Sequence, residues 1–319
     1  MITITLPDGS IKQFEAPLTG GEVAASISEG LARDCVAMEV DGQVQDIYRT
    51  IDRDAHLRLI TTRDDQALDI MRHSAAHVMA QAVLRLYDNA QLTIGPVIED
   101  GFYYDIDMAP LSEDDLARIE AEMKKIVKAK LPIRRETIRK AEALERYRDE
   151  PYKLEMIEDL PEGTISLYRQ GEFFDLCRGP HVPHTGFVKA FKLMKVSGAY
   201  WRADQSKAQL QRIYGTAYFN KKALKAYLTF LEEARKRNHR KIGEAQELFS
   251  FHDEAPGMPF FHPRGMVMWN LLLDFWREEH RRAGYVETKT PIMLQRSLWE
   301  RSGHWENYRE NMYTTVVDD

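Results

Sequence analysis

Two short motifs bring together residue types that can do chemistry. His73-Ser-Ala-Ala-His77 places two histidines four residues apart, and Cys177-Arg-Gly-Pro-His181 adds a thiol and a third imidazole, with His184 close behind. Histidines at i and i+4 share one face of a helix and can hold one ion or one substrate. The set can bind zinc, or it can hydrolyse an ester without metal, with one histidine orienting or deprotonating a water and another stabilising developing charge. The alternative is a chance placement of unrelated histidines, and the second motif argues against it.

The histidine pair requires a helix, and the pattern from Asp64 to about Tyr87 predicts one. His73 and His77 lie opposite the apolar stripe of this segment, so we expect them to face a cleft rather than the core. The stripe consists of residues at helical spacing: Leu68, Met71, Ala75, Val78, Ala82, Val83 and Leu86.

The rest of the middle region is typical of an antiparallel sheet with a second helix. That helix is expected to begin at Ser112, which forms a capping box with Asp115, and to end before Pro132. Glycines separate runs of strand composition at 102–105, 164–168, 173–177, 189–196 and 210–214. We expect these runs to pair in one antiparallel sheet.

Residues 1–62 predict a small separate unit. Residues 1–6 and 11–14 form a hairpin around Pro7-Asp8-Gly9, a small helix follows Gly20-Gly21, and short strands at 36–40 and 57–60 complete the unit. Its ten acidic residues against five basic ones give a charge of −5. This unit is therefore a poor electrostatic partner for nucleic acid.

The most basic stretch is a helix expected at 221–241. Eight lysines and arginines outweigh Glu232 and Glu233 there, which gives +6. It is either a solvated linker helix or a segment that contacts phosphates. Beyond Gly243, the loop sequence Pro256-Gly257-Met258-Pro259 precedes a new unit.

Composition excludes several classes of protein. The 319 residues are 44% hydrophobic and 29% charged, and no apolar run approaches the roughly 18 residues that span a bilayer, so neither a membrane protein nor a disordered chain is expected. Two cysteines cannot form a disulfide framework, and the N-terminus lacks the pattern of a secretory signal. We expect a cytoplasmic protein.

Longer runs around these motifs resemble bacterial threonyl-tRNA synthetases. They are His73–His77, Ile94–Asp105, Asp175–His181, Gly198–Arg202 and Gln211–Gly215, and they occur in the family's order. The resemblance implies a multidomain α+β protein. It comprises a small β-grasp (TGS) domain at 1–62, an α+β editing domain with an antiparallel sheet at 63–220, a basic linker helix at 221–242, and the truncated start of a class II antiparallel-sheet aminoacylation domain at 243–319.

The last of these regions resembles class II motif 1 at about 265–291, a long helix leading into a strand that ends in proline. Nine of the eleven residues from Met266 to Trp276 are apolar, so we expect a helix buried nearly all round, which in the family lies at a homodimer interface. The family's ATP-binding arginines and catalytic zinc ligands, and the residues that use magnesium, would lie beyond Asp319. We therefore expect no threonine-dependent pyrophosphate exchange from this chain.

The resemblance also implies an editing site. A pocket that selects threonine gains only about 1 to 3 kcal/mol against serine, so a second site must hydrolyse serine esterified to tRNA(Thr). The implied catalytic residues are His73, His77, Lys153, Asp175, Cys177 and His181, and the implied substrate-binding residues are Tyr168 and Gly95.

Individual roles follow as hypotheses. His73 or His77 positions or activates the water, Lys153 supplies a cation near the ester and ribose, and Asp175 orients a histidine or the substrate amino group. Tyr168 would shape the pocket. Surface exposure of Lys153, ordinary strand packing of Tyr168 and simple burial of Cys177 are the alternatives.

The related alanyl-tRNA synthetase editing domain holds zinc with similar motifs, whereas the threonyl family is understood to hydrolyse the ester there without a metal. We expect no resident metal, although His73, His77, Cys177 and His181 are the possible ligands. No cofactor is certain for this chain.

The acceptor arm of tRNA(Thr) is the implied partner, contacted by Lys189, Lys195, Arg202, Arg235 and Lys236 and by neighbouring basic residues such as Lys192 and Arg212. Two other functions stay open at this point: a free-standing deacylase that edits in trans, and a non-catalytic RNA-binding protein built on the TGS domain. The motif 1 helix argues against the first and the two histidine motifs against the second.

Overall fold

The N-terminal region is a five-stranded sheet in the order β2-β1-β7-β4-β5. The computed structural model describes residues 1–315 and divides the chain into two units, Met1–Glu232 and Glu233–Asp319. The strands are β1 (Ile2–Thr5), β2 (Ile11–Phe14), β4 (Cys35–Val40), β5 (Gln43–Asp46) and β7 (Ala55–Thr61), and the short β3 (Leu18–Thr19) pairs with β6 (Thr50–Ile51). The predicted hairpin is confirmed, since β1 pairs with β2 in antiparallel register.

The single small helix expected after Gly20-Gly21 is wrong, because two helices occupy that segment. They are α1 (Gly20–Ile27) and α2 (Glu29–Asp34). Ser28 between them takes an extended conformation, φ −165°, and its hydroxyl accepts the amide of Leu31. A serine that caps the next helix in this way interrupts the first one.

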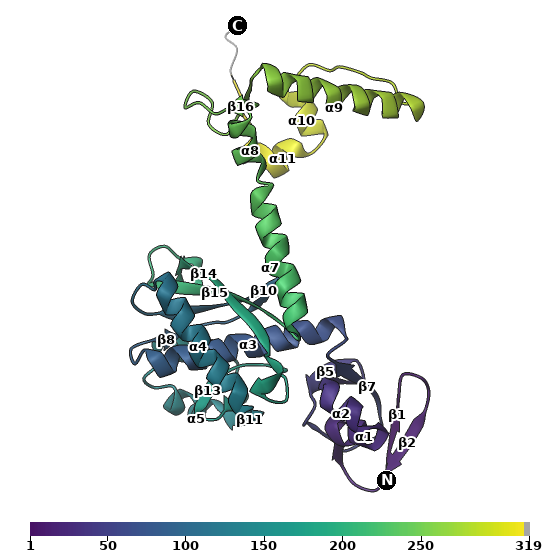
Figure 1. The fold of residues 1–319 in the computed structure, drawn as a ribbon, viewed down its shortest axis with the longest axis vertical. Helices are drawn as coiled ribbons and strands as arrows, with labels where there is room; N and C mark the ends of the chain where they lie inside the picture. The colour runs from purple at the N-terminus through teal and green to yellow at the C-terminus, as the bar shows by residue number, and fades with distance from the viewer. Residues whose placement is uncertain (316–319) are drawn as a thin grey trace. The chain divides into compact units, whose positions relative to one another are not determined.

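A long helix and a partner helix cover a sheet in the middle region (Figure 1). The helices are α3 (Asp65–Leu86) and α4 (Glu113–Ala129), and the strands run in the order β14-β15-β10-β8. These are β8 (Gln91–Leu92), β10 (Gly101–Asp107), β14 (Ala190–Tyr200) and β15 (Gln209–Tyr218), with β9 (Val97–Ile98) paired to β10. Both predicted helices are confirmed, and Ser112 and Asp115 form the expected capping box on α4.

The strands of this region belong to two sheets, so the prediction of one sheet is wrong. The second sheet has the order β11-β12-β13, from β11 (Ile133–Arg139), β12 (Thr164–Gln170) and β13 (Phe173–Leu176). It has a core of its own with α5 (Lys140–Arg146) and α6 (Pro151–Glu158), which includes Ile138, Tyr147 and Ile157. Strand β11 pairs with β12 along its whole length, so β12 and β13 need no partner in the first sheet.

Burial of α3 differs from the one-stripe prediction. Nearly all residues from Ala67 to Val83 are buried, including His77, and His73 alone of the pair is half-buried. The helix packs against α4 and β10 and also against β4 and β7 of the N-terminal sheet, so its second face is covered as well. Only part of the expected cleft-facing side is therefore open.

The basic helix is shorter than predicted. Helix α7 (Lys221–Lys236) ends before Asn238, whose side chain accepts the amides of Arg240 and Lys241 and so begins α8 (His239–Ala245). An asparagine that caps a new helix breaks the continuous helix expected at 221–241.

The second unit contains the predicted motif 1 helix. Its elements are α8, β16 (Phe249–Ser250), β17 (Phe260–Phe261), α9 (Pro263–Arg282), α10 (Arg296–Arg301) and α11 (His304–Tyr308). Short 3-10 turns lie at Thr185–Phe187, Trp201–Ala203 and Arg309–Asn311. Among the described residues of this single chain only Gly265 of α9 is buried, so the chain itself does not supply the burial expected for this helix.

The expected strand at 283–291 is also absent from the described residues. A strand needs a hydrogen-bonded neighbour, and no segment of residues 1–315 pairs with this one. Residues 316–319 of the predicted third region lie outside the described residues. Across residues 1–315, no helix is both long and apolar enough to cross a bilayer.

Candidate active site

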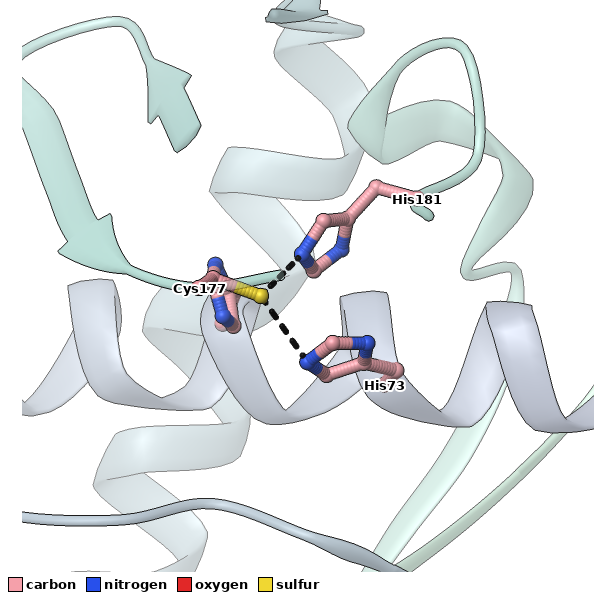
Figure 2. A group of neighbouring side chains, drawn as sticks. His73, Cys177 and His181 are labelled. Atoms are coloured by element: carbon pink, nitrogen blue, oxygen red, sulfur yellow. Dashed lines mark hydrogen bonds between the residues drawn. The ribbon is translucent and has the colours of Figure 1, made fainter. Parts of the chain in front are cut away.

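Three imidazoles and a thiol converge between α3 and the loop after β13. His73 and His77 lie on α3, Cys177 follows the last residue of β13, and His181 lies four residues further on. Their ligand atoms all lie within 4.8 Å of one another. The Sγ atom of Cys177 lies 3.2 Å from Nε2 of His73 and 3.2 Å from Nε2 of His181. Figure 2 shows these two contacts as dashed lines. The two motifs therefore form one site.

Local contacts hold the loop that carries Cys177 and His181. The amide of Gly179 donates to Sγ of Cys177 at 3.3 Å, and the amide of Val182 donates to Oγ of Ser74 at 3.0 Å. The same Ser74 oxygen lies 3.0 Å from Nδ1 of His181. Ser74 thus joins the helix to the loop directly beside His73.

Burial keeps the cluster uncharged at neutral pH. It lowers the pKa of His73, and it lowers the pKa of His77 to about 3, although Asp175 opposes both shifts. Burial also puts the pKa of His181 well below its usual value and raises the pKa of Cys177 to about 12. At pH 7 the imidazoles are neutral and the sulfur keeps its proton, and the strongly lowered pKa values of His77 and His181 make these two weaker bases than an ordinary histidine.

A buried ion pair lies beneath the cluster. Lys153 of α6 lies 2.5 Å from Oδ1 of Asp175, and its ammonium also donates to the carbonyl of Thr93 at 2.8 Å and to Oη of Tyr104 at 3.2 Å. The hydroxyl of Tyr104 donates to the other oxygen of Asp175. Nε2 of His77 lies 3.9 Å from that carboxylate.

This network decides between the alternatives for Lys153. Its side chain is 2% exposed, so it is not a surface lysine. Lys153 is the charged partner of Asp175, and the nearest histidine lies beyond hydrogen-bond distance of that carboxylate. Two buried opposite charges with further hydrogen bonds satisfy each other.

A cleft of about 580 Å³ opens beside the cluster. Of the four clustered residues, His73 and Cys177 line it. The remaining wall comes from α6, β12, β13 and the segments next to them: Met156, Leu160, Pro161, Glu162, Thr164, Ile165, Ser166, Leu176 and Arg178. His73 is therefore the imidazole best placed to meet a bound molecule.

Three residues singled out in the sequence lie elsewhere. Tyr168 is buried behind His181, with its ring centroid 4.5 Å away. Gly95 lies against Tyr104, and a Cβ at this position would come within 2.3 Å of that ring. His184 accepts the amide of Gly186 at the start of a 3-10 turn and is not part of the cluster. None of the three lines the cleft.

Sequence reasoning missed three residues of the site. Ser74 directly follows His73, and Tyr104 lies in the run Ile94–Asp105, but neither residue carries a further signal of its own in the sequence. Asp46 belongs to the N-terminal sheet and carries no sequence signal for this site, yet its carboxylate contacts Tyr168 and His181.

The four donors also fit a metal ion. Two imidazole nitrogens lie 3.2 Å from one sulfur and all four donor atoms lie within 4.8 Å of one another, so His73, His77, Cys177 and His181 would be the ligands of a zinc ion bound here. With three of these residues as ligands, the fourth position of the ion would be left to a water, whose pKa would fall to about 7.

The basic residues expected to contact tRNA are exposed but differ in their surroundings. Lys189, Lys195, Arg235 and Lys236 have exposed side chains, and Lys236 pairs with Glu233 at 3.0 Å. Arg202 contacts Glu155 at 3.0 Å and Asp159 at 2.5 Å, so two carboxylates offset its charge.

Comparisons with known proteins match two parts of the chain to families. The family described as "Threonyl and Alanyl tRNA synthetase second additional domain" matches residues 165–214, which include Asp175, Cys177 and His181. The family described as "TGS domain" matches residues 2–61.

Curated relatives match the whole chain. Proteins named "Threonine--tRNA ligase" are 66% identical over 319 residues in Desulfosudis oleivorans, 67% over 318 in Desulforapulum autotrophicum and 54% over 323 in Acetivibrio thermocellus. Each alignment covers 100% of this chain and 50%, 50% and 51% of the relative, respectively. The chain spans about half the length of the curated relatives it matches.

Proposed function

We propose, from the premise that the chain is related over its whole length to threonine-tRNA ligases, that it hydrolyses the ester of tRNA(Thr) mischarged with serine. The observation that carries this proposal is the contact of His73 and Cys177, both of which line one cleft, with each other and with the buried His181 behind them. For the protein to which this chain belongs, we also propose the activity for which the relatives are named, the attachment of threonine to tRNA, driven by ATP.

His73 is the proposed base for the reaction. Its neutral imidazole accepts a proton from a water in the cleft while the water oxygen attacks the ester carbonyl carbon. The bond from that carbon to the terminal ribose oxygen then breaks, and the proton passes to the ribose oxygen. The products are free serine and an intact tRNA, and no other reactant is consumed.

The other clustered residues hold this base in place. The Cys177 thiol and the ring of His181, 4.2 Å from that of His73 between centroids, limit the movement of the base. Burial leaves the imidazole of His77 uncharged, and the Lys153–Asp175 ion pair lies below it. Tyr168 and Gly95 act through the loop and through Tyr104 rather than by touching the substrate.

Hydrolysis without a resident metal is part of the proposal. The curated relatives are named for threonine, and the threonyl branch is the one for which sequence resemblance implies metal-free chemistry. Stoichiometric zinc in the purified chain that is lost in His77→Ala would overturn this point.

The proposed partner is the acceptor arm of tRNA(Thr), contacted by the exposed basic side chains of Lys189, Lys195, Arg235 and Lys236. A homodimer through α9 is proposed for the protein as well. A cytoplasmic location fits such a function.

The site is tested by the rate of deacylation of seryl-tRNA(Thr). His73→Ala and Cys177→Ala are expected to lose most of the activity, because they remove the base and the group beside it. His184→Gln is the matched control, a histidine of the same loop outside the cluster, and it should keep the wild-type rate. Wild-type rates in both cluster variants would contradict the site.

A further inference from the structure

A carboxylate of the N-terminal sheet reaches the candidate active site. Asp46 is the last residue of β5, and it is 8% exposed. Its Oδ2 accepts the hydroxyl of Tyr168 at 2.7 Å, and its Oδ1 accepts the backbone amide of His181 at 2.9 Å. Both oxygens of this side chain therefore hold residues more than a hundred positions away, inside the matched range 165–214.

The amide that Asp46 accepts belongs to a histidine whose position is fixed on three sides. Nδ1 of His181 lies 3.0 Å from Oγ of Ser74, and Nε2 lies 3.2 Å from Sγ of Cys177. The bond from Asp46 adds the backbone to these two ring contacts. A shift of that backbone would move the imidazole away from Cys177.

The hydroxyl that Asp46 accepts lies directly under the same loop. Gly179 has φ +70°, and a Cβ there would come within 1.9 Å of Oη of Tyr168. The loop thus follows the tyrosine ring closely, and the ring in turn packs on His181 at 4.5 Å between centroids. The position of the loop relative to the Tyr168 ring therefore depends on the hydrogen bond between the Tyr168 hydroxyl and Asp46.

A neighbouring residue of the N-terminal domain supports the same loop. The hydroxyl of Tyr48 donates to the carbonyl of Pro183 at 3.4 Å. Arg134 of β11 stacks its guanidinium 3.6 Å from the Tyr48 ring centroid and donates to the same carbonyl at 3.3 Å. Contacts from residues 46–48 therefore reach this loop at His181 and again at Pro183.

We propose that Asp46 is a positioning residue for ester hydrolysis, through which the N-terminal domain holds the loop that carries Cys177 and His181. The inference rests on the proposed function of that site. Asp46 does not line the cleft, so it acts on the reaction through the loop and not on the substrate. A displacement of about 1 Å in a reacting constellation can reduce a rate by about 100-fold.

Asp46→Asn tests this proposal in the 319-residue chain. An amide has the same shape but replaces one of the two oxygens by a donating NH2 group, so it cannot accept the Tyr168 hydroxyl and the His181 amide at their two separate positions. The single-turnover deacylation rate of seryl-tRNA(Thr) at saturating protein should fall about 10- to 100-fold, with unchanged affinity for the tRNA. Asp54→Asn is the matched control, because Asp54 also accepts a backbone amide, that of Thr3, within the N-terminal sheet, and its rate should not change.

Two further measurements separate positioning from a loss of folding. Imidazole nitrogen NMR signals of His181 should move in Asp46→Asn and stay in place in Asp54→Asn. Tyr168→Phe removes one of the two donors, so it should reduce the rate too, and Asp46→Asn combined with Tyr168→Phe should cost less than the sum of the single effects. If Asp46→Asn does not fold at the assay temperature, Tyr168→Phe decides by the same two readouts.

The outcomes are distinct. A wild-type chain that does not hydrolyse seryl-tRNA(Thr) contradicts the proposed function. The role of Asp46 alone is overturned by a different result. In that case the wild-type chain hydrolyses seryl-tRNA(Thr), and folded Asp46→Asn or Tyr168→Phe does so at the same rate, with the His181 NMR signals in their wild-type positions.

Discussion

Lys153 and Asp175 form a buried ion pair whose partners are 2% and 3% exposed. Lys153→Met should destabilise the chain by about 3 to 5 kcal/mol, because it leaves the carboxylate buried without its counter-charge. The double variant Lys153→Met with Asp175→Asn should recover part of this loss, since no charge is then left unpaired. Chemical denaturation measures the free energy of unfolding in each case.

The control for this pair is Lys125→Met. Lys125 pairs with Glu122 at 2.7 Å, but its side chain is 73% exposed, and exposed pairs contribute about 0 to 1 kcal/mol. A loss of less than 1 kcal/mol in Lys153→Met would show that the buried pair does not stabilise the fold in the way proposed.

The buried histidines predict a dependence of stability on pH. The folded pKa of His77, about 3, lies below the usual value of 6.5, so between these values the unfolded chain binds a proton that the folded chain does not. Stability should therefore fall as the pH falls below about 6.5, by about 1.4 kcal/mol per pH unit for this one group. Above pH 6.5 the contribution is constant.

His77→Asn removes this titration and should make the slope shallower by that amount. The groups that face His77 are His73, His181, Asp175 and Lys153, and the two other histidines, whose pKa values are also lowered, contribute to the wild-type slope. The pKa of Asp175 lies below its usual 3.8, so measurements from pH 6.5 down to 4.5 avoid its titration. Equal slopes in the two proteins would contradict a buried, neutral His77.

Residue types and spacing were enough to predict the cluster but not its support. The i, i+4 histidines and the Cys-x-x-x-His loop meet as their spacing suggested. Asp46 and Tyr104 are bound to the site by contacts across the fold, and such contacts leave no periodic trace in a single sequence. Lys153 is a similar case, because nothing near Pro151-Tyr152 indicates that this lysine is buried.

Local sequence predicted elements well where a cap or a turn marked them. The hairpin at the N-terminus and the capping box of α4 have such markers, and both are present. Strand β11, Ile-Arg-Arg-Glu-Thr-Ile-Arg, was missed because four of its seven residues are charged. Only its pairing with β12 makes it a strand, and that pairing divides the predicted single sheet into two.

Strand β14 and the turn after it offer a test of the proposed tRNA contacts. Lys195 is exposed, with its ammonium 4.8 Å from the ring centroid of Tyr214, and no carboxylate offsets its charge in the described residues. Arg202 is already paired with Glu155 and Asp159. Lys195→Gln should therefore weaken the dependence of tRNA affinity on salt. The slope of log K against the logarithm of the salt concentration should become shallower by about 0.9, which is the value for one lost phosphate contact on a duplex.

Arg202→Gln is the comparison for this measurement and should change the slope less. Binding titrations with tRNA(Thr) that carries no amino acid, at salt concentrations between roughly 50 and 200 mM, give both slopes. An unchanged slope in Lys195→Gln would show that this residue does not contact the tRNA. A larger change of slope in Arg202→Gln than in Lys195→Gln would contradict the expectation that the ion pairs of Arg202 reduce its contribution to tRNA binding.

Helix α9 exposes a group of large apolar side chains, and their contact with water is unfavourable for a single chain in solution. Its large side chains Leu271, Leu272 and Phe275 are 64%, 66% and 66% exposed, and Trp269 and Trp276 are 45% and 49% exposed. Contiguous apolar patches of this kind mark surfaces that bind other proteins. The sequence pattern predicted burial, and a second copy of the same helix would supply it.

The chain should therefore associate with itself in a concentration-dependent way. Sedimentation velocity over a wide range of protein concentration is expected to show dimers, and Leu272→Glu with Phe275→Glu should leave monomers, because burying two carboxylates costs more than the apolar contact returns. Phe230→Glu is the control, since Phe230 of α7 is also 66% exposed but lies outside α9, and it should not change the association. A wild-type chain that stays monomeric at every concentration would show that α9 does not cover itself with a second copy.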